Sequence, residues 1–196
     1  MRKIILSMMV SLDMQIARAD GNLDWFRSDA GFETEMLRLL RRVDGMMFGR
    51  VSYEMLAQYW PTAGASDATV SGGFSNTEVE KEFALLMNTV PKRVYSRTLK
   101  SAAWGPVTII DEVDADEIDK LRRQPGRDLV LFAGASLASE FMRHDLIDEY
   151  RLMVHPVVLG NGIPLFQELT AERPLELQRS TALPCGVVLL EYERNR

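Results

Sequence analysis

The chain has 196 residues, of which 46% are hydrophobic and 26% charged, with a formal net charge of -5 at pH 7. This length and balance fit one globular domain and exclude a disordered chain, and the acidic charge without a Lys/Arg block argues against a nucleic-acid partner. No apolar run approaches the roughly 20 residues of a membrane span, the N-terminus lacks a signal-peptide cleavage pattern, and the single cysteine, Cys185, excludes an intrachain disulfide, so we expect a cytoplasmic protein.

The first half of the sequence alternates strand and helix patterns. Residues 3–10, rich in Ile, Leu, Met and Val, predict a buried strand. Apolar residues at helical spacing predict a helix over 31–44, followed by a short strand over 45–49 and a helix over 50–59. Residues 60–75 are rich in Gly, Ser, Ala and Thr and predict a loop, which is either a lid over a ligand or a plain surface segment.

The rest of the chain, from residue 75 onward, continues the alternation and ends in strands alone. Alternation argues for parallel strands covered by helices, and a closing hairpin adds antiparallel strands. The predicted fold class is therefore α/β: a single domain over residues 1–196, with a mixed, mainly parallel central sheet, helices on both faces and a C-terminal antiparallel hairpin. The elements expected here are a capping box at 75–78, a helix that Pro91 ends, strands over 93–95, 107–110 and 129–132, a helix capped by Asp114, a helix after Ala133, a strand over 150–159, and a hairpin of 175–181 with 187–192.

The stretch LVLFAGASLASEF, residues 129–141, passes from a strand to a helix through a turn of small residues. Such a turn can hold a phosphate on the helix N-terminus, where N–H groups and the helix dipole favour an anion. It can also present Ser136 as the nucleophile of a G-x-S-x-G elbow, although Ala138 stands where the second glycine belongs. His155 is then the candidate base, in an apolar strand just before Pro156. This turn alone leaves both alternatives open.

Three small or polar turns follow predicted strands, and two of them carry an arginine. Ligands of open α/β sheets bind at the carboxyl ends of the strands, where helix N-termini and arginines suit phosphates. The sequence therefore predicts a nucleotide site without the G-x-G-x-x-G fingerprint of a Rossmann domain. No metal site is expected, because His144, His155 and Cys185 lack zinc-ligand spacing. The turns are Gly49-Arg50-Val51-Ser52, Ser96-Arg97-Thr98 and Gly134-Ala135-Ser136-Leu137.

Several segments, spread over nearly the whole chain, have residues typical of a known family. They are residues 10–13, 16–17, 24–25, 49–54, 92–99, 146–152 and 156–166. Together they resemble the dihydrofolate reductase-like superfamily. Within it, they are most similar to stand-alone relatives of the riboflavin-biosynthesis reductase domain, the C-terminal half of the bifunctional deaminase-reductase. The resemblance implies an NADPH-dependent reductase of a pyrimidine- or pteridine-like small molecule, similar to 5-amino-6-(5-phosphoribosylamino)uracil reductase.

The resemblance also implies roles for individual residues. The cofactor's phosphates would be held by Gly49, Arg50 and Ser52, its 2′-phosphate side by Ser96, Arg97 and Thr98, and its pyrophosphate by Gly134, Ala135, Ser136 and Leu137. The substrate ring would lie near Ala17 and Trp25, where Asp13 or Asp24 could orient or protonate it. The resemblance further implies a homodimer, and the long apolar strand over 150–159 would suit a subunit interface.

This sequence departs from the family pattern on the substrate side. Met14 replaces a common glycine, Gln15 a common lysine, and Phe132 a glutamate of the riboflavin reductases, while Asn22 stands at the carboxylate position of dihydrofolate reductases. The resemblance therefore implies the reductase class without a named substrate. Two alternatives are kept beside it: a serine hydrolase that uses Ser136, and a nucleotide-binding relative without turnover.

Overall fold

The computed structural model describes residues 1–63, 78–167, 169 and 171–195. Within these residues, eight strands form one sheet in which six neighbouring strands are parallel and the last two are antiparallel to their neighbours. From edge to edge the strands are β5 (Val107–Ile110), β4 (Lys92–Tyr95), β3 (Val43–Gly49), β6 (Asp128–Phe132), β1 (Ile4–Ser11), β7 (Glu149–His155), β10 (Val188–Arg194) and β9 (Leu175–Ala182).

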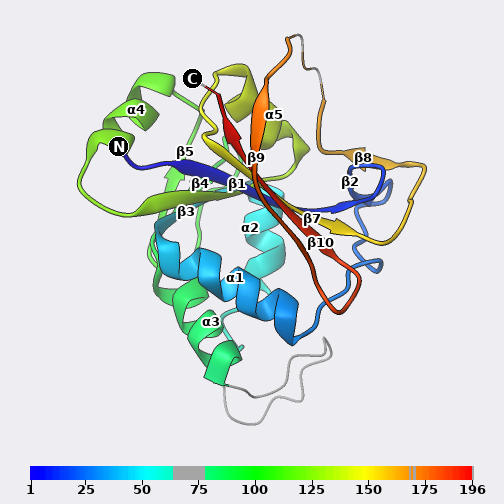
Figure 1. Cartoon of the computed structure of the whole chain (residues 1–196). Helices are drawn as coiled ribbons and strands as arrows, with labels where there is room; N and C mark the ends of the chain where they lie inside the picture. The colour runs from blue at the N-terminus through cyan, green and yellow to red at the C-terminus, as the bar shows by residue number, and fades with distance from the viewer. Residues whose placement is uncertain (64–77, 168, 170, 196) are drawn as a thin grey trace.

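Helices cover both faces of this sheet. The helices that precede β4 in the chain lie on one face, and those that follow β5 lie on the other, as Figure 1 shows. The α/β class, the mainly parallel sheet and the closing hairpin are therefore confirmed. The helices of the first face are α1 (Ala30–Arg42), α2 (Arg50–Ala57) and α3 (Glu78–Thr89), and those of the second face are α4 (Ala115–Arg123) and α5 (Ala135–Arg143). Residues 75–77 of the predicted capping box and most of the predicted loop over 60–75 lie outside the described residues.

Local sequence explains where α1 begins and how it packs. The Asp29 side chain accepts a hydrogen bond from the Phe32 N–H at 2.8 Å and so caps the helix. Phe32, Met36 and Leu40 follow at intervals of four residues, and all three are buried against the sheet. Each fully buried side chain of this size contributes about 1.5–3 kcal/mol of hydrophobic free energy. The helix ends at Arg42 rather than at the predicted residue 44, because Val43 already pairs with Asp128 in the sheet.

The strand predicted over 150–159 is shorter than expected. It ends at His155, because Pro156 has no N–H for the ladder and the Val157 N–H turns back to the His155 carbonyl at 2.8 Å. It also lies inside the sheet, with β1 on one side and β10 on the other. The apolar sequence from Tyr150 to His155 is thus explained by burial within its own chain, and these residues expose no surface to a second subunit. The helix predicted over 50–59 likewise ends early, at Ala57.

A second, two-stranded sheet was not predicted from the sequence. It pairs β2 (Gln15–Arg18) with β8 (Gly162–Pro164), strands that are far apart in the chain. Gly162 permits the pairing, because a Cβ at that position would lie 2.6 Å from the Ala17 carbonyl oxygen. This small sheet fixes the segment after β1 against the segment after β7, on the side where the strands of the main sheet end (Figure 1).

Candidate functional site

The carboxyl ends of β4, β3 and β6 lie side by side, because these three strands are parallel neighbours. Each end leads into one of the three predicted turns. Gly49 ends β3 and is the N-cap residue of α2, and Gly134 follows β6 and is the N-cap residue of α5. Ser96 follows β4 directly. The fold therefore brings the predicted cofactor residues together at the carboxyl edge of the sheet, which is the side where its parallel strands end.

The N-termini of α2 and α5 approach each other across this edge. A Cβ built on Gly49 would lie 3.8 Å from the Leu137 side chain of α5, and one built on Gly134 would lie 3.9 Å from the Ser52 Oγ of α2. The first N–H groups of a helix have no acceptor within the helix, and neither glycine offers a capping side chain. The two helices therefore present N–H groups and positive dipole ends to the same space, which suits a phosphate or pyrophosphate.

The backbone at these two glycines does not itself require glycine. Gly49 has φ -81° and ψ 164°, and Gly134 has φ -75° and ψ 170°, values that any L-residue adopts. The Cβ positions just described are ordinary contacts and not clashes. What glycine provides is the space in front of the helix N-termini that a larger side chain would fill. A close-approaching ligand needs that space.

The third turn is closed by its own serine. The Ser96 Oγ accepts hydrogen bonds from the N–H groups of Thr98 and Leu99 at 3.2 and 2.9 Å. Ser96 is buried, so its side chain shapes the turn, whereas Arg97 and Thr98 are exposed. The Arg97 guanidinium lies 3.6 Å from the Glu112 carboxylate, and both side chains are more than two-thirds exposed. Such an exposed pair is weak, which leaves Arg97 available to a phosphate.

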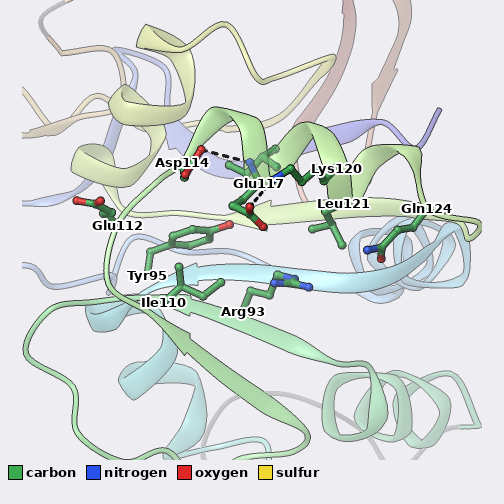
Figure 2. Close-up of a pocket in the computed structure, with 10 residues that line it drawn as sticks. Arg93, Tyr95, Ile110, Glu112, Asp114, Glu117, Lys120, Leu121 and Gln124 are labelled. Carbon is green, nitrogen blue, oxygen red and sulfur yellow. Dashed lines mark hydrogen bonds and ion pairs between the residues drawn. The ribbon is translucent and has the colours of Figure 1, made fainter.

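A pocket of about 140 Å³ lies beside this turn, between β4, β5 and α4 (Figure 2). Tyr95 and Arg93 enter it from β4, and three carboxylates, those of Glu112, Asp114 and Glu117, line its other side. Burial raises the pKa of Tyr95 to about 12, so the phenol stays neutral. The excess of carboxylates disfavours an anion, and we place this pocket outside the phosphate site.

On the substrate side, Asp13 connects two loops. Its carboxylate accepts hydrogen bonds from the Ser11 Oγ at 2.6 Å, the Leu159 N–H at 3.1 Å and the Gly160 N–H at 2.8 Å. The Ser11 bond, followed by those backbone bonds, lowers the pKa of Asp13 to about 2. Asp13 is therefore an anion at neutral pH. It can accept hydrogen bonds and hold the loop after β1 to the loop after β7, but it has no proton to donate there.

The other predicted substrate residues occupy different environments. Asp24 is exposed, and its carboxylate accepts a hydrogen bond from the Arg18 Nε at 2.6 Å. Ala17 is buried in β2, where it pairs with Ile163. Trp25 is 7% exposed and packs edge-on against His155, with ring centroids 5.1 Å apart. The structure thus places Trp25 with His155, which the sequence suggested either as a hydrolase base or as a packed core or interface residue.

The serine hydrolase alternative receives no support from the geometry. Ser136 is exposed at the start of α5, and in the described residues no hydrogen bond joins it to a histidine. The His155 ring is fully buried among Trp25, Phe26 and Phe32. Burial, together with the nearby Arg27, lowers the pKa of His155 to about 4, which makes it a poor general base at neutral pH.

Two further searches concern only the part of the chain that the structure describes. There, no group of three or more His, Cys, Asp or Glu side chains is arranged to hold a metal ion, and no helix is long and apolar enough to cross a membrane.

The mainly parallel sheet with helices on both faces and an antiparallel C-terminal strand pair is a dihydrofolate reductase-like fold. A dihydrofolate reductase from Enterococcus faecalis, solved with NADP(H), shares this fold with a TM-score of 0.60 at 10% identity, over 99% of this chain and 97% of that one. More closely, the chain matches the family described as RibD C-terminal domain over residues 2–189, and it belongs to that family.

Closer relatives cover the whole chain. The uncharacterized protein YyaP of Bacillus subtilis (strain 168) is 34% identical over 99% of this chain and 96% of its own length. A protein from Shewanella sp. PV-4, described as a candidate riboflavin biosynthesis protein, is 26% identical, and its crystal structure superimposes with a TM-score of 0.72 over 100% of both chains. The chain is therefore similar over its full length to proteins of about its own size.

Proposed function

We propose that this protein is an NADPH-dependent reductase of a pyrimidine- or pteridine-like small molecule, similar to 5-amino-6-(5-phosphoribosylamino)uracil reductase. The observation that carries the proposal is the pair of uncapped helix N-termini, in which Gly49 faces Leu137 and Gly134 faces Ser52. Membership of the RibD C-terminal domain family supports the same class of reaction.

The residues at the carboxyl ends of β3, β4 and β6 fit nicotinamide adenine dinucleotide phosphate. The first-turn N–H groups of α2 and α5 would bind the phosphates together with the Arg50 guanidinium, which now pairs with Glu54 at 2.8 Å. Exposed Arg97 would bind the 2′-phosphate, which NADH lacks. Ser96 would act through the turn that it closes. When bound, the cofactor supplies the hydride.

We propose different roles for the two aspartates on the substrate side of the site. Asp13, as an anion bonded to three donors, would hold the loop that borders the substrate. Asp24 is exposed beside Arg18 and would orient the ring, with Trp25 and Ala17 as neighbours. Asp13 has no proton to give at neutral pH, and Asp24 is a carboxylate paired with Arg18, so we assign the proton to a water molecule that Asp24 would orient.

We further propose a cytoplasmic homodimer, on the basis of the family resemblance. The residues of β7 from Tyr150 to His155 are buried, so we place the interface on another strand. β9 forms an edge of the sheet and presents Leu177 with 51% of its surface exposed, which suits a contact with a second copy. Light scattering of the purified protein measures the mass directly. A monomer at working concentration would contradict this part of the proposal.

The central experiment is a titration of the purified protein with NADPH and with NADH, followed by the fluorescence of Trp25, Trp60 and Trp104. We expect saturable binding with a preference for NADPH. NADPH oxidation is then screened with pyrimidine and pteridine compounds. Binding of neither nucleotide would refute the reductase. NADPH binding without oxidation of any of these compounds would favour the relative without turnover. Labelling by a serine-directed phosphonate that Ser136→Ala abolishes would favour the hydrolase.

A further inference from the structure

Trp25 and His155 are adjacent buried rings, with centroids 5.1 Å apart, and each has a ring nitrogen without a hydrogen-bond partner. Among the residues that the structure describes, neither the Trp25 Nε1 nor the His155 Nε2 has an acceptor or donor within reach. Trp25 is 7% exposed and His155 is 0% exposed, so neither nitrogen can form a hydrogen bond with bulk water instead. A buried, unpartnered polar group is costly, and two on adjacent rings call for an explanation.

The hydrogen bonding of His155 defines what kind of partner is missing. Its Nδ1 accepts the backbone N–H of Arg27 at 3.3 Å. The neutral ring therefore carries its proton on Nε2, because one nitrogen of a neutral imidazole donates when the other accepts. The lowered pKa of His155 keeps the ring neutral at physiological pH. The indole nitrogen of Trp25 is always a donor. Both unpartnered atoms are thus N–H donors, and the missing partner is an acceptor.

The position of this pair connects it with the candidate site. His155 is the last residue of β7 and lies in register with Ser11, the last residue of β1. Ser11 also donates to Asp13, which holds the loop beside it. β7 is two strands from β6, which leads to the Gly134 turn, so the pair lies on the order of 10 Å along the same edge from the proposed phosphate site.

We infer that the Trp25 Nε1–H and the His155 Nε2–H bind acceptor oxygens of the substrate, and so select a ring that carries carbonyl groups over one that carries amino groups. This inference rests on the proposed function and adds to it the polarity of the substrate edge and a binding role for His155. The pair is closed over in this structure.

The test compares two pyrimidines of the same size. 5,6-Diaminouracil carries ring carbonyls at positions 2 and 4, where 2,4,5,6-tetraaminopyrimidine carries amino groups. Their affinities are measured by calorimetry at pH 8 with the protein saturated with NADP⁺. We expect the wild type to prefer the diaminouracil by about 30-fold or more, since each amino group would oppose a buried donor. Trp25→Phe and His155→Phe should each reduce that preference about tenfold and leave the affinity for the tetraamine within about twofold.

Phe26→Leu is the matched control, because Phe26 packs on the His155 ring at 5.3 Å without a polar atom. It should keep the preference of the wild type. Each variant is first checked for its melting temperature and for NADPH affinity. Should one of them fail to fold, the wild type still decides: the diaminouracil, and not the tetraamine, should move the Trp25 indole proton resonance downfield.

Equal affinity for the two pyrimidines, binding of neither, or an unchanged preference in both Phe variants would overturn the inference. Such a result with intact NADPH binding leaves the reductase proposal standing. Failure of the NADPH titration itself refutes the reductase first, so the two failures are distinguishable.

Discussion

The helices of this protein begin in two different ways. α1 and α4 begin after aspartates, and the carboxylates of Asp29 and Asp114 accept the N–H groups of the first turn. α2 and α5 begin after glycines, with no capping side chain. The aspartate-capped helices begin where Figure 1 shows their N-termini apart, whereas the glycine-capped pair meets at the carboxyl edge of the sheet. The same N–H groups that Asp29 and Asp114 satisfy are left for a ligand in α2 and α5.

This difference teaches what the glycines cost and what they provide. An aspartate N-cap in place of glycine stabilises a helix by a few tenths of a kcal/mol, and a residue other than glycine restricts the unfolded chain by about 0.4–1 kcal/mol more. The backbone at Gly49 and Gly134 would accept such residues without strain. The protein therefore forgoes stability at the two places where an anion would bind. Substitutions that exchange the two kinds of helix start should separate stability from binding.

The largest effect is expected from Gly134→Asp. The new carboxylate would cap α5 and take the N–H groups that a phosphate needs, and it would repel the phosphate as well. NADPH affinity should fall more than about 100-fold, while the free energy of unfolding rises by about 0.5 kcal/mol or more. Nucleotide titration and urea unfolding measure the two changes.

Gly134→Ser is the matched control for charge. It places a neutral cap at the same position and should weaken NADPH only about tenfold. If Gly134→Asp bound NADPH as the wild type does, the N-terminus of α5 would not be a phosphate site.

The next effect concerns the third turn. Arg97→Ala should weaken NADPH about tenfold, or about 1.4 kcal/mol, and should change NADH affinity little, because only NADPH carries the 2′-phosphate. The comparison variant is Arg38→Ala, which removes an exposed arginine from α1. Equal losses for both nucleotides in Arg97→Ala would move Arg97 away from the 2′-phosphate and toward the pyrophosphate.

The capped helices provide the opposite case. Asp114→Ala removes the side chain that accepts the N–H groups of Asp116 and Glu117 at 2.8 and 3.2 Å. The free energy of unfolding should fall by about 1 kcal/mol, and NADPH affinity should stay unchanged. Chemical denaturation with a parallel nucleotide titration checks both statements. A loss of affinity would show that α4 and its pocket belong to the cofactor site after all.

The sequence predicted correctly those features that depend on residues close together in the chain. The cap at Asp114 was predicted from adjacent residues, and the structure confirms it. The meeting of the turns at Gly49 and Gly134 was predicted from a general property of parallel sheets. Its specific contact, between Gly49 and Leu137, depends on the pairing of β3 with β6 and could not be predicted from either segment.

Tertiary contacts explain what the sequence did not predict. The pairing of β2 with β8 joins segments of three and four residues, too short for a periodic pattern, across most of the chain. The carboxylate of Asp13 bonds to Leu159 and Gly160, which are 146 and 147 residues away, so the sequence predicted an acid and not an anchored anion. His155 looked like a core residue and is one, but its unpartnered Nε2 is visible only in three dimensions.

The smallest expected effect extends the comparison beyond helices. Asp13 satisfies backbone N–H groups as Asp29 and Asp114 do, but in loops. Its folded-state pKa of about 2 lies below the ordinary value of 3.8, so its contribution to stability is present above pH 4 and is lost as the pH falls toward 2. The stability advantage of the wild type over Asp13→Asn should therefore shrink between pH 5 and pH 2. Ser11→Ala removes the hydrogen bond that lowers the pKa of Asp13 most. The stability advantage of the wild type over this variant should also shrink between pH 5 and pH 2, but by less than its advantage over Asp13→Asn. Melting temperatures across this pH range measure the difference. A gap that stays constant down to pH 2 would mean that the charge of Asp13 does not hold the two loops together.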